Sequence, residues 1–345
     1  MKNRLKEKIA YLTSLIGVSG NEQQVMKYCR DFLKPLADEV TVLPIGDVIA
    51  KFDSGKPGPK LMIAAHADEI GFTVRHISKD GFLYFKEIGG IDTNILPGQR
   101  VWIHGSKGRI LGVIGRKPIH LQDKSEGARE LYPEDLWIDI SVSDKAQALN
   151  AVQIGDVATI ISEPVVMPNE TIVSRALDDK VGLAVLAGVA QNLGDIKADV
   201  YLVASVQEEL GARGARMVSE YVKPDVGIAI DVTHATDYPT MSPVKDGDIS
   251  LGKGAVVPLG PNMHKDVSRQ LISIAQEKDI PVQIEAIAKP TGTDAKEIQV
   301  SGCGTMTGLI SIPCRYMHTP NEIVSLMDAE YAIRLLTEYL KTSVK

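Results

Sequence analysis

Apolar positions at the start of the chain follow a helical period. In the first segment they recur every three or four residues, at Leu5, Ile9, Leu12, Leu15 and Ile16. Gly17 and Gly20 punctuate the end of this predicted helix, and a second one is predicted from residue 21 to about 36. Two β-like runs follow, at 40–52 and 60–65. The run Leu61–Ala65 is continuously apolar, as in a strand buried on both faces.

The pattern changes between about residue 69 and residue 164. Short β-rich pieces alternate there with Gly, Pro and Asp turns, and the one convincing helical period lies near 144–151. The predicted strands are 71–77, 82–88, 100–104, 108–114, 136–142 and 156–161. Several short strands at near-regular spacing predict a small barrel or sandwich.

After residue 164 helices and strands alternate again. The predicted helices are 178–193, 211–222, 266–277 and 327–340, and the predicted strands are 171–174, 200–206, 226–230, 282–288 and 306–312. Such alternation predicts a mostly parallel sheet covered by helices on both faces. We therefore predict an α/β domain formed by residues 1–68 and 165–345, interrupted by an all-β insertion at 69–164.

Composition narrows the class of protein. The 345 residues are 44% hydrophobic and 24% charged, with a net charge of −6, so the chain is expected to fold and to bury a sizeable core. An acidic balance argues against partners that need a basic face, namely nucleic acid and membrane surfaces. Three cysteines cannot all pair, the start of the chain does not read as a signal peptide, and no apolar run approaches a membrane span. We expect a cytoplasmic protein.

Acids and histidines follow the predicted strands. They are His66-Ala67-Asp68-Glu69, Asp178-Asp179, Gln207-Glu208-Glu209, Asp231 and His318-Thr319-Pro320-Asn321-Glu322. In open α/β sheets, ligands bind beyond the carboxyl ends of the strands, so these side chains are expected to converge on one edge.

Packed carboxylates repel one another unless protons or a cation neutralise them. Carboxylates together with imidazoles suit zinc, cobalt or manganese, and two cations about 3.5–4 Å apart, bridged by a carboxylate and a water, would use this many ligands. Each motif also has a structural explanation when it is taken alone. Glu208-Glu209 could be a solvated helix start, Asp178-Asp179 a helix cap and His318 a core histidine.

Two pairs of residues that are close in the sequence suggest distinct roles for their members. Asp68, two residues after His66, is expected to orient the imidazole and raise its basicity. Glu208 and Glu209 are adjacent on an extended segment, so their side chains point to different sides. One glutamate can then bind metal while the other faces the substrate.

These blocks resemble a known family. The matching segments are Ala65–Gly71, Arg175–Gly182, Gln207–Ala215, Thr291–Ala295 and His318–Glu322. Together they resemble the M42 metallo-aminopeptidases, which include the tetrahedral (TET) aminopeptidases and proteins called glutamyl aminopeptidase or endoglucanase M. The resemblance extends over essentially the whole chain.

The resemblance implies a three-layer α/β/α zinc-peptidase domain of the phosphorylase/hydrolase-like type with a PDZ-like or barrel insertion. It also implies two divalent cations, zinc or cobalt first and manganese as a further option. One would be held by His66, Asp178 and Asp231, and the other by Asp178, Glu209 and His318. The peptide bond between Asp178 and the next aspartate is expected to be cis.

By the same resemblance, Glu208 is the general base that activates a water between the two cations, and Asp68 belongs to the catalytic residues. The substrates implied are short peptides with a free N-terminus. The insertion would build dimers, and the dimers a tetrahedral dodecamer.

Two other functions remain open at this point. A metal-dependent glycosidase needs two free carboxylates and aromatic sugar platforms, whereas the chain has two Trp and five Phe. A non-catalytic metal-binding scaffold would not need Glu208 beside Glu209. Asp294 could shape the pocket or cap a turn, and we do not expect His234 to be a ligand. The sequence leaves open the native metal, the residue cleaved, the physiological substrate and the actual oligomeric state.

Overall fold

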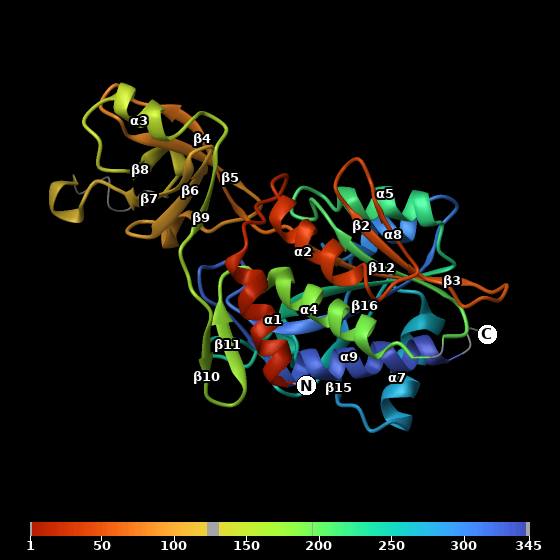
Figure 1. Cartoon of the computed structure of the whole chain (residues 1–345). Helices are drawn as coiled ribbons and strands as arrows, with labels where there is room; N and C mark the ends of the chain where they lie inside the picture. The colour runs from red at the N-terminus through yellow and green to blue at the C-terminus, as the bar shows by residue number, and fades with distance from the viewer. Residues whose placement is uncertain (1, 123–130, 195, 343–345) are drawn as a thin grey trace.

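The computed structural model describes residues 2–122, 131–194 and 196–342. The described chain forms a large sheet flanked by helices and a separate closed barrel that projects from one side (Figure 1). This arrangement confirms the predicted α/β fold with an inserted β-barrel.

An eleven-stranded sheet forms the centre of the larger unit. Its main path runs in the order β1 (Glu39–Val42), β2 (Val48–Phe52), β12 (Asp199–Ser205), β3 (Lys60–His66), β13 (Val226–His234), β16 (Met306–Arg315), β17 (Glu322–Ser325), β11 (Thr171–Ser174) and β10 (Val165–Met167). Beside β16 lies β14 (Ala255–Leu259), which pairs with β15 (Val282–Ala286). The four central strands β12, β3, β13 and β16 are parallel. The prediction of a mostly parallel sheet holds for this centre and is wrong for the edges, where β1–β2, β2–β12, β16–β17, β17–β11 and β11–β10 are antiparallel.

Helices cover both faces of the sheet, as the three-layer prediction requires. One face carries α1 (Lys2–Ser14), α2 (Gln23–Leu33), α4 (Leu177–Asn192), α7 (Lys265–Glu277) and α9 (Leu326–Lys341), and the other carries α5 (Arg213–Val222) and α8 (Ala295–Val300). The side chains of β3 alternate between the two apolar cores. Leu61 and Ile63 enter the core under α4, whereas Met62 and Ala64 enter the core under α5.

The insertion closes into a barrel of six strands with its own apolar core. The strand order is β4 (Gly71–Ile77), β5 (Leu83–Ile88), β8 (Trp137–Asp139), β7 (Gly108–Gly115), β6 (Arg100–Gly105) and β9 (Val157–Ile160). Among the described strands closure leaves no free sheet edge, and Phe72, Ile103 and Ile138 fill the interior. Helix α3 (Lys145–Ala151) is the one predicted near 144–151.

Three short strands of the sheet, β10, β14 and β17, were not predicted. Pro258 lies within β14, and proline weakens a strand pattern because it cannot donate to the ladder. Strand β13 also runs past its predicted end, pairing with β16 as far as His234 opposite Cys314. Asp231 therefore lies inside a strand, with the side chain of Thr233 on the same face.

Among the described residues, none of the helices combines the length and the apolar character that a membrane crossing requires.

Candidate metal centre

Two groups of possible metal ligands meet at the carboxyl ends of the central strands. His66, Asp178 and Asp231 form one group, and Asp178, Glu209 and His318 form the other. Within each group the ligand atoms lie within 4.8 Å of one another. His66 ends β3, Asp231 lies on β13, and Asp178 enters from the first turn of α4. The structure thus brings together the five residues that the sequence singled out as ligands, and Asp178 belongs to both groups.

The first group is buried. His66 Nε2 lies 3.0 Å from Asp178 Oδ1 and 3.8 Å from Asp231 Oδ1. Burial raises the pKa of Asp231 well above its ordinary value. Burial also disfavours a charged His66, but hydrogen bonds to carboxylates outweigh that effect and raise its pKa. Such a set of acids stabilises positive charge at its centre, as a bound cation would provide.

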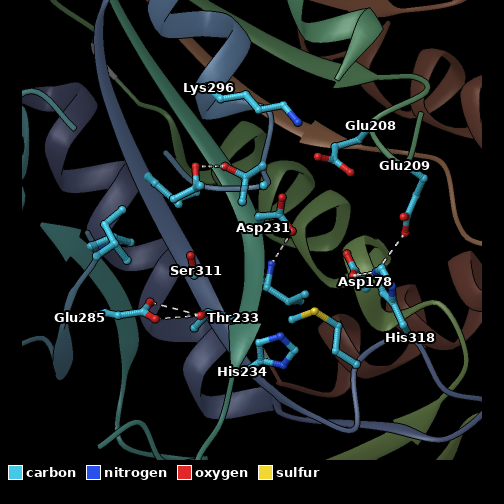
Figure 2. Close-up of a pocket in the computed structure, with 18 of the residues that line it drawn as sticks. Asp178, Glu208, Glu209, Asp231, Thr233, His234, Glu285, Lys296, Ser311 and His318 are labelled. Atoms are coloured by element: carbon cyan, nitrogen blue, oxygen red, sulfur yellow. Dashed lines mark hydrogen bonds and ion pairs between the residues drawn. The ribbon is translucent and has the colours of Figure 1, made fainter. Parts of the chain in front are cut away.

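The second group opens toward the cavity and uses the other oxygen of the shared aspartate. His318 Nε2 lies 3.2 Å from Asp178 Oδ2 and 3.4 Å from Glu209 Oε1. Hydrogen bonds to Asp178 and Glu209 raise the pKa of His318 to about 11. Figure 2 shows these three side chains pointing toward one another. One carboxylate therefore faces both groups.

The start of α4 separates the two neighbouring aspartates. The peptide bond between Asp178 and Asp179 is cis, as the family resemblance implied. Asp179 turns inward, and its Oδ1 accepts a hydrogen bond from the backbone N–H of Gly182 at 3.0 Å. The helix-cap explanation is therefore right for Asp179, while Asp178 joins the ligand groups.

Asp68 makes contacts that the sequence did not predict. Its two oxygens accept the backbone N–H groups of Glu208 at 2.9 Å and Glu209 at 3.0 Å. Its Oδ1 also lies 3.4 Å from His66 Nδ1, longer than a good hydrogen bond. Asp68 thus ties the loop with the two glutamates to the end of β3, in addition to lying beside His66.

Glu322, like Asp68, holds two backbone segments in place, on the other side of the centre. Its Oε2 accepts the backbone N–H of Asp178 at 3.0 Å, and its Oε1 accepts that of His318 at 2.9 Å. The side chain is buried, so it holds two ligand-bearing segments without facing the cavity. Sequence reasoning did not assign it a role, although it ends the motif that begins at His318.

The inserted barrel contributes directly to the centre. His318 Nδ1 forms a 2.8 Å hydrogen bond with the carbonyl oxygen of Gly90, in the loop between β5 and β6. Beside it, a Cβ added at Gly89 would lie 3.1 Å from Glu209 Oε2. Nothing in the local sequence of this loop indicated the contact, which joins residues 228 positions apart.

Glu208 belongs to neither ligand group and lines the adjoining cavity, whose volume is about 430 Å³. Its Oε1 is buried and, among the described residues, has no hydrogen-bond partner. Burial is the largest cause that raises the pKa of Glu208 to about 8. Figure 2 shows its carboxylate between the side chains of Asp231 and Glu209.

The remaining candidates lie outside the ligand groups. Asp294 is buried and accepts a hydrogen bond from Ser205 Oγ at 2.5 Å, and its side chain does not cap α8. His234 lines the cavity wall and belongs to neither of the two candidate ligand groups of the described residues.

A three-layer α/β/α domain with two histidine–carboxylate groups at its strand ends fits a metal-dependent peptidase. The chain belongs to the M42 glutamyl aminopeptidase family, whose profile matches residues 46–335. It is therefore a hydrolase of the aminopeptidase class, and membership implies a divalent metal, for which the two ligand groups are the candidates.

Relatives support this assignment over nearly the whole chain. Lysyl aminopeptidase of Pyrococcus furiosus is 37% identical over 331 residues, which cover 94% of this chain and 93% of the relative. Aminopeptidase APDkam598 of the archaeon Desulfurococcus kamchatkensis superposes with a TM-score of 0.94 at 36% identity, covering 99% of this chain and 96% of the other. PhTET1-12s, a dodecamer in the asymmetric unit, superposes with a TM-score of 0.86 at 29% identity, covering 97% and 98%.

Proposed function

We propose that the protein removes the N-terminal residue of short peptides at a centre of two divalent cations, with Glu208 as the proton-transferring residue. The observation that carries the proposal is the shared carboxylate of Asp178, whose two oxygens face two separate ligand groups. A centre for one cation would not need the second group.

The imidazole and carboxylate donors of the site fit two divalent cations of intermediate softness. His66, Asp178 and Asp231 would hold one, and Asp178, Glu209 and His318 the other. Imidazole and carboxylate ligands suit zinc and cobalt, with manganese as a further option. When bound, such cations lower the pKa of water and polarise the carbonyl of the bond to be cleaved.

Glu208 is suited to move protons because its oxygens are not committed to the ligand groups. Its buried, unpartnered Oε1 can accept a proton from the attacking water and pass it to the nitrogen of the leaving amine. Asp68 fixes the backbone of Glu208 and Glu209, and so positions the base and a ligand together.

Replacing Glu208 by glutamine tests this role. We expect Glu208→Gln to retain its metal, measured by atomic emission, and to lose about two to four orders of magnitude in kcat on an aminoacyl-p-nitroanilide. Glu277→Gln on the exposed end of α7 removes the same charge and serves as the control. Near-normal turnover by Glu208→Gln would refute the role, while Asp231→Asn or His318→Gln with full metal occupancy would contradict the ligand assignment.

A glycosidase is the second function to be tested, and the structure gives it less support. The site's acids cluster in ligand groups with two histidines, whereas glycoside hydrolysis uses a pair of free carboxylates that flank the bond. Loss of aminoacyl-p-nitroanilide cleavage on chelation, with no turnover of a soluble cellulose, separates the two functions.

We also propose that residues 69–164 form the assembly domain and that residues 1–68 and 165–345 form the catalytic domain. The barrel exposes the apolar side chains of Leu111, Val113 and Leu121, with exposed fractions of 48%, 42% and 68%. Their burial between copies would stabilise a dimer, and dimers would build a dodecamer as in PhTET1-12s. Light scattering that gives a 37.4 kDa monomer would contradict this assembly.

A further inference from the structure

The cavity beside the ligand groups continues well past the reacting centre. Asp178, Glu208 and Asp231 line one part of it, and Thr233 and Glu285 line another. Figure 2 shows Glu285 on the far side of Thr233 from the ligand groups. A substrate side chain that leaves the reacting centre in this direction would end at the Glu285 carboxylate.

Strand β13 sets the distance between the ligand groups and Glu285. Asp231 and Thr233 are two residues apart on this strand and so face the same side. Two strand residues span about 6.6 Å. Glu285 lies just beyond, because Thr233 Oγ1 is 3.1 Å from its Oε2 and 3.4 Å from its Oε1. The four-carbon stem of a lysine side chain covers a similar span.

Glu285 is a half-buried carboxylate without a cation of its own. Within the described part of the chain, no lysine or arginine pairs with it, and the exposed His234 lies nearby. Burial raises the pKa of Glu285, which means that its surroundings do not fully stabilise the charged form. An incoming ammonium group would supply that stabilisation.

Apolar side chains also line the cavity. Pro258, Ile287 and Met317 are among its lining residues. Such walls favour the methylene stem of a long cationic side chain, whose charged head then meets the acid at the end. An acidic side chain would instead face the Glu285 carboxylate.

Lys296 is the competing charged group in the cavity. In the view of Figure 2 it lies beyond Asp231, toward Glu208 and opposite Glu285. Its ammonium group points toward Glu208 in this view, so it faces the acids of the reacting centre and not Glu285. We therefore do not expect it to select an acidic substrate.

We propose that Glu285 is a specificity-determining residue that selects peptides with a basic N-terminal residue, lysine before arginine. The inference rests on the proposed aminopeptidase function and adds the class of substrate. Selection arises because the carboxylate gains a partner only when the bound side chain carries a cation at its end.

The test compares lysyl-, norleucyl- and glutamyl-p-nitroanilide with the cation-loaded enzyme. Norleucine has the lysine stem without the ammonium group, so the ratio of the two kcat/KM values isolates the charge. We expect wild-type enzyme to favour lysyl over norleucyl substrate at least tenfold. We expect Glu285→Gln to lower that ratio at least tenfold, and Glu285→Lys to favour the glutamyl substrate over the lysyl one.

Controls separate a specificity effect from a folding defect. Glu277→Gln on the exposed end of α7 should keep the wild-type ratio. Metal content and melting temperature of each variant show whether the centre is intact, and Glu285→Gln carries the test if the lysine variant does not fold.

Four outcomes would overturn the inference. A wild-type ratio near one, or an unchanged ratio in Glu285→Gln, removes Glu285 as the selector while cleavage of norleucyl substrate still supports the aminopeptidase. A wild-type preference for the glutamyl substrate that Lys296→Gln abolishes assigns selection to Lys296. Absence of cleavage of all three substrates contradicts the proposed function itself, and the inference with it.

Discussion

Carboxylates at the centre divide into two kinds according to what their oxygens contact. Asp178, Glu209 and Asp231 present oxygens to the ligand groups. Asp68 and Glu322 instead accept two backbone N–H groups each, and each joins segments far apart in the chain. A carboxylate suits this task because both of its oxygens are acceptors.

Replacing Glu322 by glutamine is therefore expected to harm the centre without touching a ligand. The amide side chain has one acceptor oxygen, so its NH₂ group would face a backbone donor of Asp178 or His318. We expect a loss of about 1–3 kcal/mol in unfolding free energy, measured in urea, because a buried donor loses its partner. Metal affinity should fall about 10–100-fold. Unchanged values for both would show that this carboxylate does not position the ligands.

A pH effect is predicted from His104, far from the ligand groups. Burial, with a smaller contribution from Arg109, lowers the pKa of this residue to about 4. Its Nε2 forms a 2.9 Å hydrogen bond with Thr159 Oγ1 across strands β6 and β9 of the barrel. Because the folded pKa is lower than the ordinary 6.5, the stabilisation is present above pH 6.5 and is lost as the pH falls toward 4.

We expect this loss to be about 1–2 kcal/mol, after allowance for the partial exposure of the ring. Urea unfolding of wild type and His104→Gln at pH 7 and pH 4.5 measures it, since titration of the other groups cancels in the difference. If both proteins lose the same stability between these pH values, His104 does not make the predicted contribution.

At the scale of elements, the loop between β5 and β6 couples the barrel to the centre. Gly89 has φ +78°, and a Cβ there would lie 2.5 Å from Ile70 Cγ2 and 3.1 Å from Glu209 Oε2. We expect Gly89→Ala to displace the loop, weaken the hydrogen bond from His318 Nδ1 to the Gly90 carbonyl oxygen, and lower metal affinity as well as kcat. The clash is expected to add about 1–3 kcal/mol of destabilisation.

Gly98→Ala is the matched control for this change. Gly98 also has positive φ, +85°, but a Cβ there meets no atom within 4 Å. It should therefore show the backbone strain alone, with metal affinity and kcat retained. Equal effects of the two variants on metal affinity would contradict a specific contact between the loop and the centre.

At the scale of the whole molecule, the excess of acids gains a local explanation. The net charge is −6, and four carboxylates, of Asp178, Glu208, Glu209 and Asp231, lie together at one edge of the sheet. Like charges at such a distance destabilise the fold unless cations or protons neutralise them. Folding and metal binding should therefore be linked.

Chelation is expected to lower the melting temperature as well as the activity. Each cation at 100 times its dissociation constant adds about 2.7 kcal/mol of stability. Calorimetry of the chelated protein, followed by titration with zinc or cobalt, should show a rise that Asp231→Asn reduces, because one ligand group is then incomplete. A melting temperature independent of metal would contradict the linkage.

Much of this fold was predictable because helices and strands have local periods. The amphipathic spacing of α1 and the continuous apolar run of β3 each identify their element from neighbouring residues alone. The short strands β10, β14 and β17 lack such a pattern, because three to five residues carry too little periodicity. The antiparallel edges of the sheet depend on pairing between distant segments, which no local period encodes.

By itself the sequence determined the α/β framework and the interrupting barrel, and it predicted that acids and histidines meet at one edge of the sheet, while the choice of five of them as ligands came from the family resemblance. The common edge was predictable because parallel strands carry their last residues to the same end of a sheet. Only the tertiary structure decided which backbone groups Asp68 and Glu322 hold, that Gly90 reaches His318, and that Glu285 lines the cavity. These contacts arise where loops and strand registers bring together residues far apart in the chain, and their geometry depends on the packing of the whole molecule.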